Sequence, residues 1–324
     1  MTAITAIRRS LMGIACLSLL FAATVHCRAQ DRENLESPVY RVERDDATVQ
    51  RVALVDPNPP AKDVLPAPPA KQVLDEVPGP APAPGHPLDT ALDQATIARD
   101  LIRATIDDYE CIVVKQEAID GELLPREFIA AKVRNRKTEN GEIKVPFGVY
   151  LNFLRPSSMK GREVVFIEGK NNEKMMAHEG GFKGRLLPSV WLNPNGALAM
   201  RGNRYPVTEL GVENLCVRLL ERAPQMISRE TCEVEMIPGA KLNGRICTCF
   251  QVIHPIQVAG VVAHKIQVFH DDEYNIPVHY AAYDFPREGE SQGQVLESYT
   301  YLNVKLNVGL TDADFDPENP NYNF

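Results

Sequence analysis

Apolar residues recur along the chain with two different periods, and the change of period separates helices from strands. In residues 88–106 they fall every three or four positions, which predicts an amphipathic helix of about 20 residues. The same spacing runs from Thr208 or Glu209 to about Ala223 and stops at Pro224. From residue 109 to 178 and again from 230 to 307, apolar and polar residues alternate instead, as in strands with one buried face.

Turn residues separate the predicted strands at hairpin spacing. Asp120-Gly121, Asn140-Gly141 and Asn243-Gly244 are typical of tight turns between antiparallel strands. Connections this short cannot contain the crossovers that a parallel sheet requires. We therefore predict an α+β fold, in which a strongly curved antiparallel sheet of about nine to eleven strands forms an open half-barrel and helices cover its concave face.

The N-terminal residues show neither period. Residues 1–29 are typical of a signal peptide, because Arg8 and Arg9 precede an apolar run over residues 11–25 and Ala29 precedes the expected cleavage site. The run is short for a membrane span, which needs about 20 residues. An uncleaved anchor is the alternative. The chain is thus expected to be exported, to the periplasm or beyond the cell, with no integral membrane span after cleavage.

A proline-rich stretch follows the expected signal peptide. Residues 30–87 hold twelve of the 25 prolines and a single aromatic residue, Tyr40. Such a small apolar surface cannot offset the entropy lost when the backbone is ordered. The segment is therefore predicted to be a disordered linker. The folded domain is expected to span residues 88–324.

The charge of the chain restricts its partners. The formal net charge is −8, and losing residues 1–29, which carry three arginines and no acid, would shift it to −11. An acidic chain of this kind disfavours nucleic acid as a partner. We expect either a lipid or other hydrophobic ligand or a protein of the cell envelope, and no cofactor.

Five cysteines would remain after cleavage, in a compartment that favours disulfides. Cys232 lies on a predicted strand that turns at Asn243-Gly244 into the strand of Cys247 and Cys249. A bridge from Cys232 to one of those two is therefore expected. The zinc alternative for Cys247 and Cys249 is disfavoured, because structural zinc sites space their cysteines by two to four residues and a second such pair is missing. No metal site is predicted.

No stretch of the sequence predicts a reaction. His178-Glu179 lacks the second histidine of a metalloprotease helix, and no catalytic residue is predicted. The inward positions of strands and helices would line a hydrophobic cleft, although a packed core would use the same residues. The candidates for the cleft are Val149, Leu151, Phe153, Leu215, Leu219 and Phe315.

Several short motifs resemble one bacterial family of unknown function, the domain of unknown function 1571. They include Tyr109-Glu110-Cys111, Lys160-Gly161-Arg162, and residues 149–154, 204–209 and 239–245. The resemblance spans roughly residues 100–320, and it implies no activity because that family has none assigned.

A fainter likeness joins residues 299–312 to the end of the lipoprotein-carrier half-barrels, in which helices at the mouth of a curved sheet shield an acyl chain. This likeness implies an exported, non-enzymatic binding or carrier protein with a hydrophobic cleft for a lipid or acyl ligand. One alternative is an interaction or scaffold module of the envelope without a small ligand. A hydrolase is the third hypothesis.

Overall fold

A computed structural model describes residues 37–41, 86–184, 186–226 and 232–324. The signal peptide expected in residues 1–29 and most of the linker expected in residues 30–87 lie outside these described residues. Residues 38–324 form a unit of their own. Within the described part of the chain, no helix combines the length and the apolarity needed to cross a membrane.

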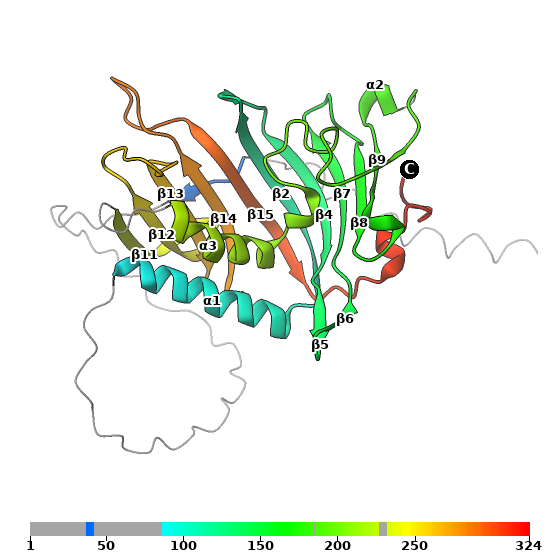
Figure 1. The fold of residues 1–324 in the computed structure, drawn as a ribbon, viewed down its shortest axis with the longest axis horizontal. Helices are drawn as coiled ribbons and strands as arrows, with labels where there is room; N and C mark the ends of the chain where they lie inside the picture. The colour runs from blue at the N-terminus through cyan, green and yellow to red at the C-terminus, as the bar shows by residue number, and fades with distance from the viewer. Residues whose placement is uncertain (1–36, 42–85, 185, 227–231) are drawn as a thin grey trace, which may run out of the picture. The chain divides into compact units, whose positions relative to one another are not determined.

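Thirteen strands pair into one open antiparallel sheet (Figure 1). A short strand, β3 (Glu122–Leu123), pairs with β2, and β5 (Lys137–Glu139) forms a separate hairpin with β6 (Glu142–Val145). From edge to edge the others run β1 (Tyr40–Arg41), β11 (Glu233–Leu242), β12 (Arg245–Ile253), β13 (Lys265–Asp271), β14 (Ile276–Tyr283), β15 (Val295–Leu306), β2 (Asp108–Ile119), β4 (Glu127–Arg134), β7 (Gly148–Arg155), β8 (Glu163–Ile167), β9 (Met175–His178) and β10 (Val190–Leu192).

The predicted fold class is confirmed, because the sheet is antiparallel, curved and open. The strand count is higher than the nine to eleven expected. Pro125 separates β3 from β4, since proline cannot donate to a ladder, and the short edge strands β1 and β10 fall outside the alternating segments. The Asn243-Gly244 turn forms as predicted, with both residues at positive φ, the conformation that a two-residue hairpin requires.

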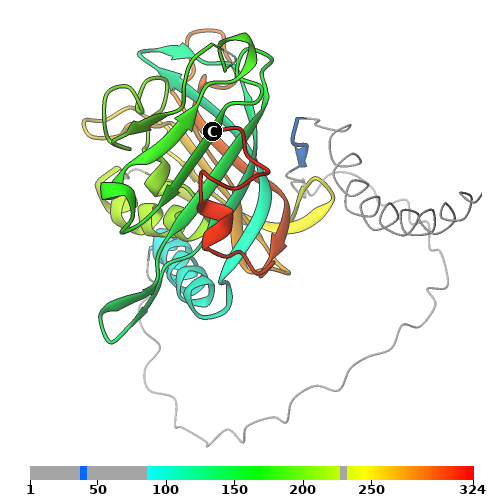
Figure 2. The ribbon, with the colours of Figure 1, turned by 90° about the vertical axis from the view of Figure 1, so that its right-hand side faces the viewer.

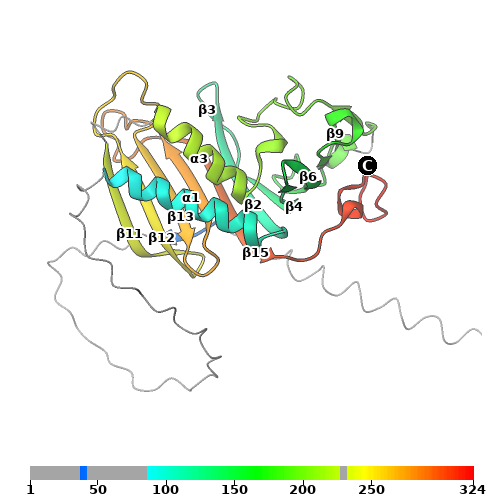
Figure 3. The ribbon, with the colours of Figure 1, turned by 60° about the horizontal axis from the view of Figure 1, so that its bottom comes forward.

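Two long helices, α1 (Pro87–Thr105) and α3 (Val212–Met226), lie across one face of the sheet, over β11 to β14 (Figure 3). The first helix begins one residue before the predicted start, and the His86 imidazole accepts a hydrogen bond from the Leu88 amide at its N-terminus. Shorter helical segments are α2 (Gly181–Gly184) and the 3-10 turns η2 (Asn171–Glu173), η3 (Val207–Glu209) and η4 (Asp312–Phe315).

At β7 and β8, two hydrophobic clusters lie on opposite faces of the sheet. The larger contains Val149 and Leu151 together with the buried sides of α1 and α3. The smaller contains Tyr150, whose side chain must point the other way because strand residues alternate. Phe315 belongs to this smaller cluster, so its expected position in the helix-covered cleft is wrong. The C-terminal segment, drawn in red in Figure 2, places it there. The same segment stacks Tyr322 on Tyr150, with ring centroids 3.8 Å apart.

One part of the predicted disordered linker is an edge strand. Tyr40 and Arg41 pair with Leu242 and Lys241 of β11. Next to them, the Val39 amide donates to Asn243 Oδ1 at 2.7 Å and the Asn243 amide donates to the Val39 carbonyl at 2.8 Å. Backbone pairing needs no apolar side chains, which is why a composition argument missed it.

The register of β11 and β12 corrects the expected disulfide. Cys247 lies opposite Ala240, and Cys249 lies opposite Ile237. Cys232 precedes Ile237 by five positions, which is about 16 Å along a strand at about 3.3 Å per residue. A disulfide needs Cα atoms within about 7 Å. Cys232 therefore cannot bridge to either cysteine while β11 and β12 keep this register.

Candidate functional site

An apolar cavity of about 90 Å³ lies between α1, α3 and the sheet. One face of α1 lines it with small and medium side chains at helical spacing, and three strands close the opposite side. The apolar wall consists of Leu88, Ala91, Leu92, Ala95 and Ala98 of α1, Leu215, Cys216 and Leu219 of α3, and Phe250, Val252, Ile266, Val268 and Pro277 of the sheet.

The cavity exists because α1 presents alanines where its neighbours leave room. Ala91, Ala95 and Ala98 follow one another at three- and four-residue spacing, so they share a face of the helix. A rigid helix cannot follow every depression in the sheet beneath it, so short side chains here leave volume unfilled. Cys216 contributes an uncharged wall, since burial raises the pKa of its thiol to about 12.

Four polar side chains form one end of the cavity. Glu297 of β15 accepts hydrogen bonds from the Tyr205 hydroxyl at 3.2 Å and the Tyr280 hydroxyl at 3.1 Å. The guanidinium of Arg218 lies over the Tyr205 ring, 3.4 Å from its centroid. Burial, aided by the charge of Glu297, raises the pKa of Tyr280 well above its usual value, so Tyr280 remains a proton donor. This end can contact a polar group, and Gln94 and His270 are the other polar side chains of a lining that is otherwise apolar.

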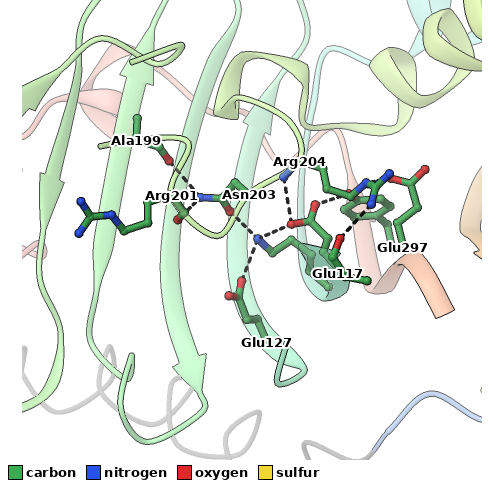
Figure 4. A network of polar contacts seen from close by, with 10 residues as sticks. Glu117, Glu127, Ala199, Arg201, Asn203, Arg204 and Glu297 are labelled. Atoms are coloured by element: carbon green, nitrogen blue, oxygen red, sulfur yellow. Dashed lines mark hydrogen bonds and ion pairs between the residues drawn. The ribbon is translucent and has the colours of Figure 1, made fainter. Parts of the chain in front are cut away.

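Behind this end, a network of charged and polar side chains fixes the loop of residues 193–211 to the sheet (Figure 4). Lys115 Nζ lies 3.4 Å from Glu117, 3.1 Å from Glu127 and 2.5 Å from Asn203 Oδ1. The Arg204 amide donates to Glu117 at 3.2 Å, and its guanidinium donates to the Ala118 carbonyl at 2.9 Å.

The same network reaches the cavity through Arg204 and Tyr299. Arg204 Nε lies 3.4 Å from Glu297 Oε2, and the Tyr299 hydroxyl donates a short hydrogen bond to Glu117. Burial raises the pKa of Glu127, an effect that Lys115 partly offsets. The loop therefore holds Tyr205 in the cavity wall through contacts with β2 and β15.

Hydrogen bonds that join α1 to other elements gather at its C-terminal end. Lys137 Nζ donates to the Arg103 carbonyl at 2.7 Å, and Asn307 Nδ2 donates to the Thr105 carbonyl at 2.9 Å. The Arg103 side chain also pairs with Glu213 of α3 at 2.7 Å. The cavity, in contrast, lies against the N-terminal two thirds of the helix, where apolar contact dominates. Helix α1 is thus anchored at one end and covers the cavity with the other.

Of the six residues expected to line a cleft, Leu215 and Leu219 contact this cavity. Val149, Leu151 and Phe153 lie on the same face of the sheet but in its packed core, away from the cavity. The polar end was missed altogether. Glu117 and Glu297 are buried on strands, and a carboxylate at an otherwise apolar inward position was the signal that could have revealed them.

His178 lines a shallow groove of about 580 Å³ beside α2, together with Lys160 and Phe182. Its Nδ1 lies 3.0 Å from Ser189 Oγ, yet Ser189 does not line the groove. The described residues that line the groove carry no hydroxyl or thiol, so the Ser189 hydroxyl that His178 contacts lies outside this lining. Among the residues that the structure describes, no three His, Cys, Asp or Glu side chains converge as a metal ion would require.

Fold and site together define an open, curved antiparallel sheet with two helices over a largely apolar cavity, at one end of which polar side chains gather. The chain belongs to the family of proteins of unknown function DUF1571, whose model matches residues 106–324, and this confirms the predicted family. Among curated proteins, none matches the chain.

Solved structures with a similar fold include a DUF1329 family protein from Desulfovibrio piger, at 12% identity and a TM-score of 0.33, covering 72% of this chain and 98% of that one. A LolA superfamily protein from Nitrosomonas europaea is 11% identical with a TM-score of 0.27, covering 70% of this chain and 96% of that one. The MucA/MucB complex of Pseudomonas aeruginosa gives 12% identity and a TM-score of 0.37, covering 70% of this chain and 60% of that one.

Proposed function

We propose that this protein is an exported, non-catalytic binding or carrier protein of the cell envelope, which holds a lipid or acyl ligand in the cavity beneath α1 and α3. The observation that carries the proposal is a largely apolar wall in which four of the six polar side chains, those of Glu297, Tyr205, Tyr280 and Arg218, gather at one end. A ligand with a hydrocarbon part and one polar group matches that arrangement. The apolar N-terminal run of residues 11–25 supports export.

The size of the cavity sets a condition on binding. Its volume of about 90 Å³ is smaller than the roughly 150 Å³ of an engineered apolar cavity that holds one benzene molecule, so a whole acyl chain exceeds it. The proposal therefore includes a displacement of the N-terminal part of α1 when the ligand enters. That movement breaks mainly apolar contacts, which the hydrocarbon of the ligand would replace, while the hydrogen bonds at Arg103 and Thr105 keep the helix attached.

Filling the cavity tests the proposal. In an Ala95→Phe variant, the added ring would occupy the space, and we expect the affinity for a fluorescent fatty acid to fall by about tenfold or more, which corresponds to about 1.4 kcal/mol. Titration of the fluorescence measures this change. Native mass spectrometry of the purified protein should also show lipid bound to the parent and less lipid bound to the variant.

An Ala104→Phe variant provides the matched control, because Ala104 lies exposed on the same helix. Its affinity should equal that of the parent protein. If the parent protein carries no lipid and does not bind the fatty acid, or if Ala95→Phe and Ala104→Phe bind equally, the cavity is not a ligand site.

A further inference from the structure

The hairpin that joins β9 to β10 exposes large apolar side chains at its tip. Phe182 is 76% exposed, Leu186 is 68% exposed and Leu187 is 49% exposed. Val190 and Trp191 follow on β10, each 41% exposed. Exposed apolar groups clustered in this way are uncommon on a protein that contacts only water, and they mark surfaces that meet a protein or a membrane.

This apolar tip is held in place from its base. The Gly181 amide donates to the Lys160 carbonyl at 2.8 Å, and His178 contacts Ser189 across the hairpin. Gly180 packs so closely against the 159–162 turn that a Cβ there would lie 2.4 Å from the Met159 carbonyl oxygen. The exposed side chains therefore project from a base that is fixed to the sheet.

The hairpin sequence is basic, in contrast to the whole chain. Residues 180–192 include Lys183 and Arg185 and no aspartate or glutamate, whereas the chain carries a net charge of −8, and Lys160 lines the same groove as Phe182. The adjoining acid, Glu179, is paired with Arg162 at 3.0 Å. Basic residues beside exposed Trp, Phe and Leu are the combination that favours the interface of an anionic bilayer, where rings and aliphatic chains enter the headgroup region.

We propose that the tip of the β9–β10 hairpin, with Phe182 and Leu186 foremost and Trp191 on the adjoining strand, docks the protein on a bilayer surface that contains anionic phospholipid. Figures 1 and 2 show α2 at the upper end of the sheet and α1 across the lower end. The docking surface is thus separate from the cavity, and it does not depend on what the cavity holds.

Trp191 is the only tryptophan of the chain, so its fluorescence reports directly on this surface. With vesicles of phosphatidylglycerol and phosphatidylcholine, the emission of the full chain should shift to shorter wavelength. The shift should be smaller with phosphatidylcholine alone and should weaken as salt is added, because salt screens the attraction between the basic residues and the headgroups.

A Phe182→Ser, Leu186→Ser double variant should bind the anionic vesicles about tenfold more weakly or worse, because two exposed apolar side chains no longer enter the bilayer. An Ile256→Ser, Val262→Ser variant is the matched control, since these side chains are 60% and 51% exposed in a different loop. It should bind like the parent. Residues 11–25 are identical in all three proteins, so any contribution they make to vesicle binding cancels.

Two results would overturn the proposal. One is a Trp191 emission that does not respond to anionic vesicles. The other is equal vesicle binding by the parent and the Phe182→Ser, Leu186→Ser variant. If, in addition, the parent self-associates in solution and the double variant does not, the surface is an interface between two copies of this chain instead.

Discussion

One face of the sheet is covered by helices in one half of the sheet and partly by a loop in the other half. Over β11 to β15, the cover is a pair of helices, and a cavity remains beneath them. Over β2, β4 and β7, the cover includes the loop of residues 193–211, which polar contacts fix to the strands. There Val133 and Val149 are fully buried in the packed core.

The difference shows how a folded domain can contain a cavity while its backbone hydrogen bonds remain satisfied. A loop adapts its backbone to the strands below and so fills the space, although its backbone groups then need partners, as when the Arg204 amide donates to Glu117. The backbone hydrogen bonds of a helix are made within the helix itself, so a helix can span a depression in the sheet and leave it empty. The helix-covered half is therefore the part of the sheet that can accept a ligand.

The largest effect expected is a contrast between two phenylalanines. Phe153 lies in the packed core and Phe250 lines the cavity. Phe153→Ala should lower the free energy of unfolding by about 4 kcal/mol, because it opens a new cavity in a packed region. Phe250→Ala should cost less, about 2 kcal/mol, since its ring already has open space on one side. Denaturant unfolding of both variants measures the contrast, and equal losses would mean that the two halves are equally well packed.

Lys115→Met should break the polar network of the loop-covered half. The substitution leaves the buried carboxylates of Glu117 and Glu127 without their ammonium, at an expected cost of about 3 kcal/mol at neutral pH. Burial already raises the pKa of Glu127, so the folded protein binds that proton more tightly than the unfolded chain. The cost should therefore shrink as the pH falls and Glu127 becomes neutral. Unfolding followed at several pH values checks this, and a cost that does not change with pH would contradict it.

Acid should weaken the helix-covered half through His279, which is 1% exposed on β14 with Nδ1 2.8 Å from Thr300 Oγ1. Burial lowers the pKa of His279 to about 4. The unfolded chain takes up this proton near the ordinary histidine pKa of about 6.5. The free energy of unfolding therefore has its full value above that pH and falls by roughly 3 kcal/mol as the pH approaches 4.

A His279→Gln variant isolates this contribution, because glutamine can keep a hydrogen bond to Thr300 and has no proton to gain. Its free energy of unfolding should depend less on pH between 6.5 and 4 than that of the parent. Some dependence will remain, since burial also lowers the pKa of His254 and His270. Identical slopes for variant and parent would show that His279 is not protonated on unfolding in this range.

Local patterns predicted most of the fold. The spacing of apolar residues located both long helices, and Asn243-Gly244 located a hairpin turn because its geometry requires positive φ. Counting outward from that turn also places Cys247 opposite Ala240, so the register that excludes the disulfide was present in the sequence. Position along the strands, rather than membership of neighbouring strands, decides whether two cysteines can meet.

The network behind the polar end of the cavity could not be predicted in the same way. Lys115 and Asn203 lie 88 positions apart in sequence, and only the folded sheet brings them together. Neither residue has a distinctive local context. The cavity itself depends on how far α1 stands from β12 and β13, which is a property of packing and leaves no periodic signal. Leu215 and Leu219 were predicted as lining residues because the spacing of apolar residues shows which side of a helix is buried. The distance between a helix and a sheet does not follow from that spacing.

The most direct test of the central claim is to find where a ligand lies. A photoreactive fatty acid, activated in the presence of the full chain and followed by peptide mapping, should label residues of α1, α3 and β12 to β14 around Leu92, Leu219 and Phe250. An excess of unlabelled fatty acid should suppress that labelling. Labelling that is confined to the hairpin around Phe182 and Trp191, or that unlabelled fatty acid does not suppress, would contradict the claim that the helix-covered half holds the ligand.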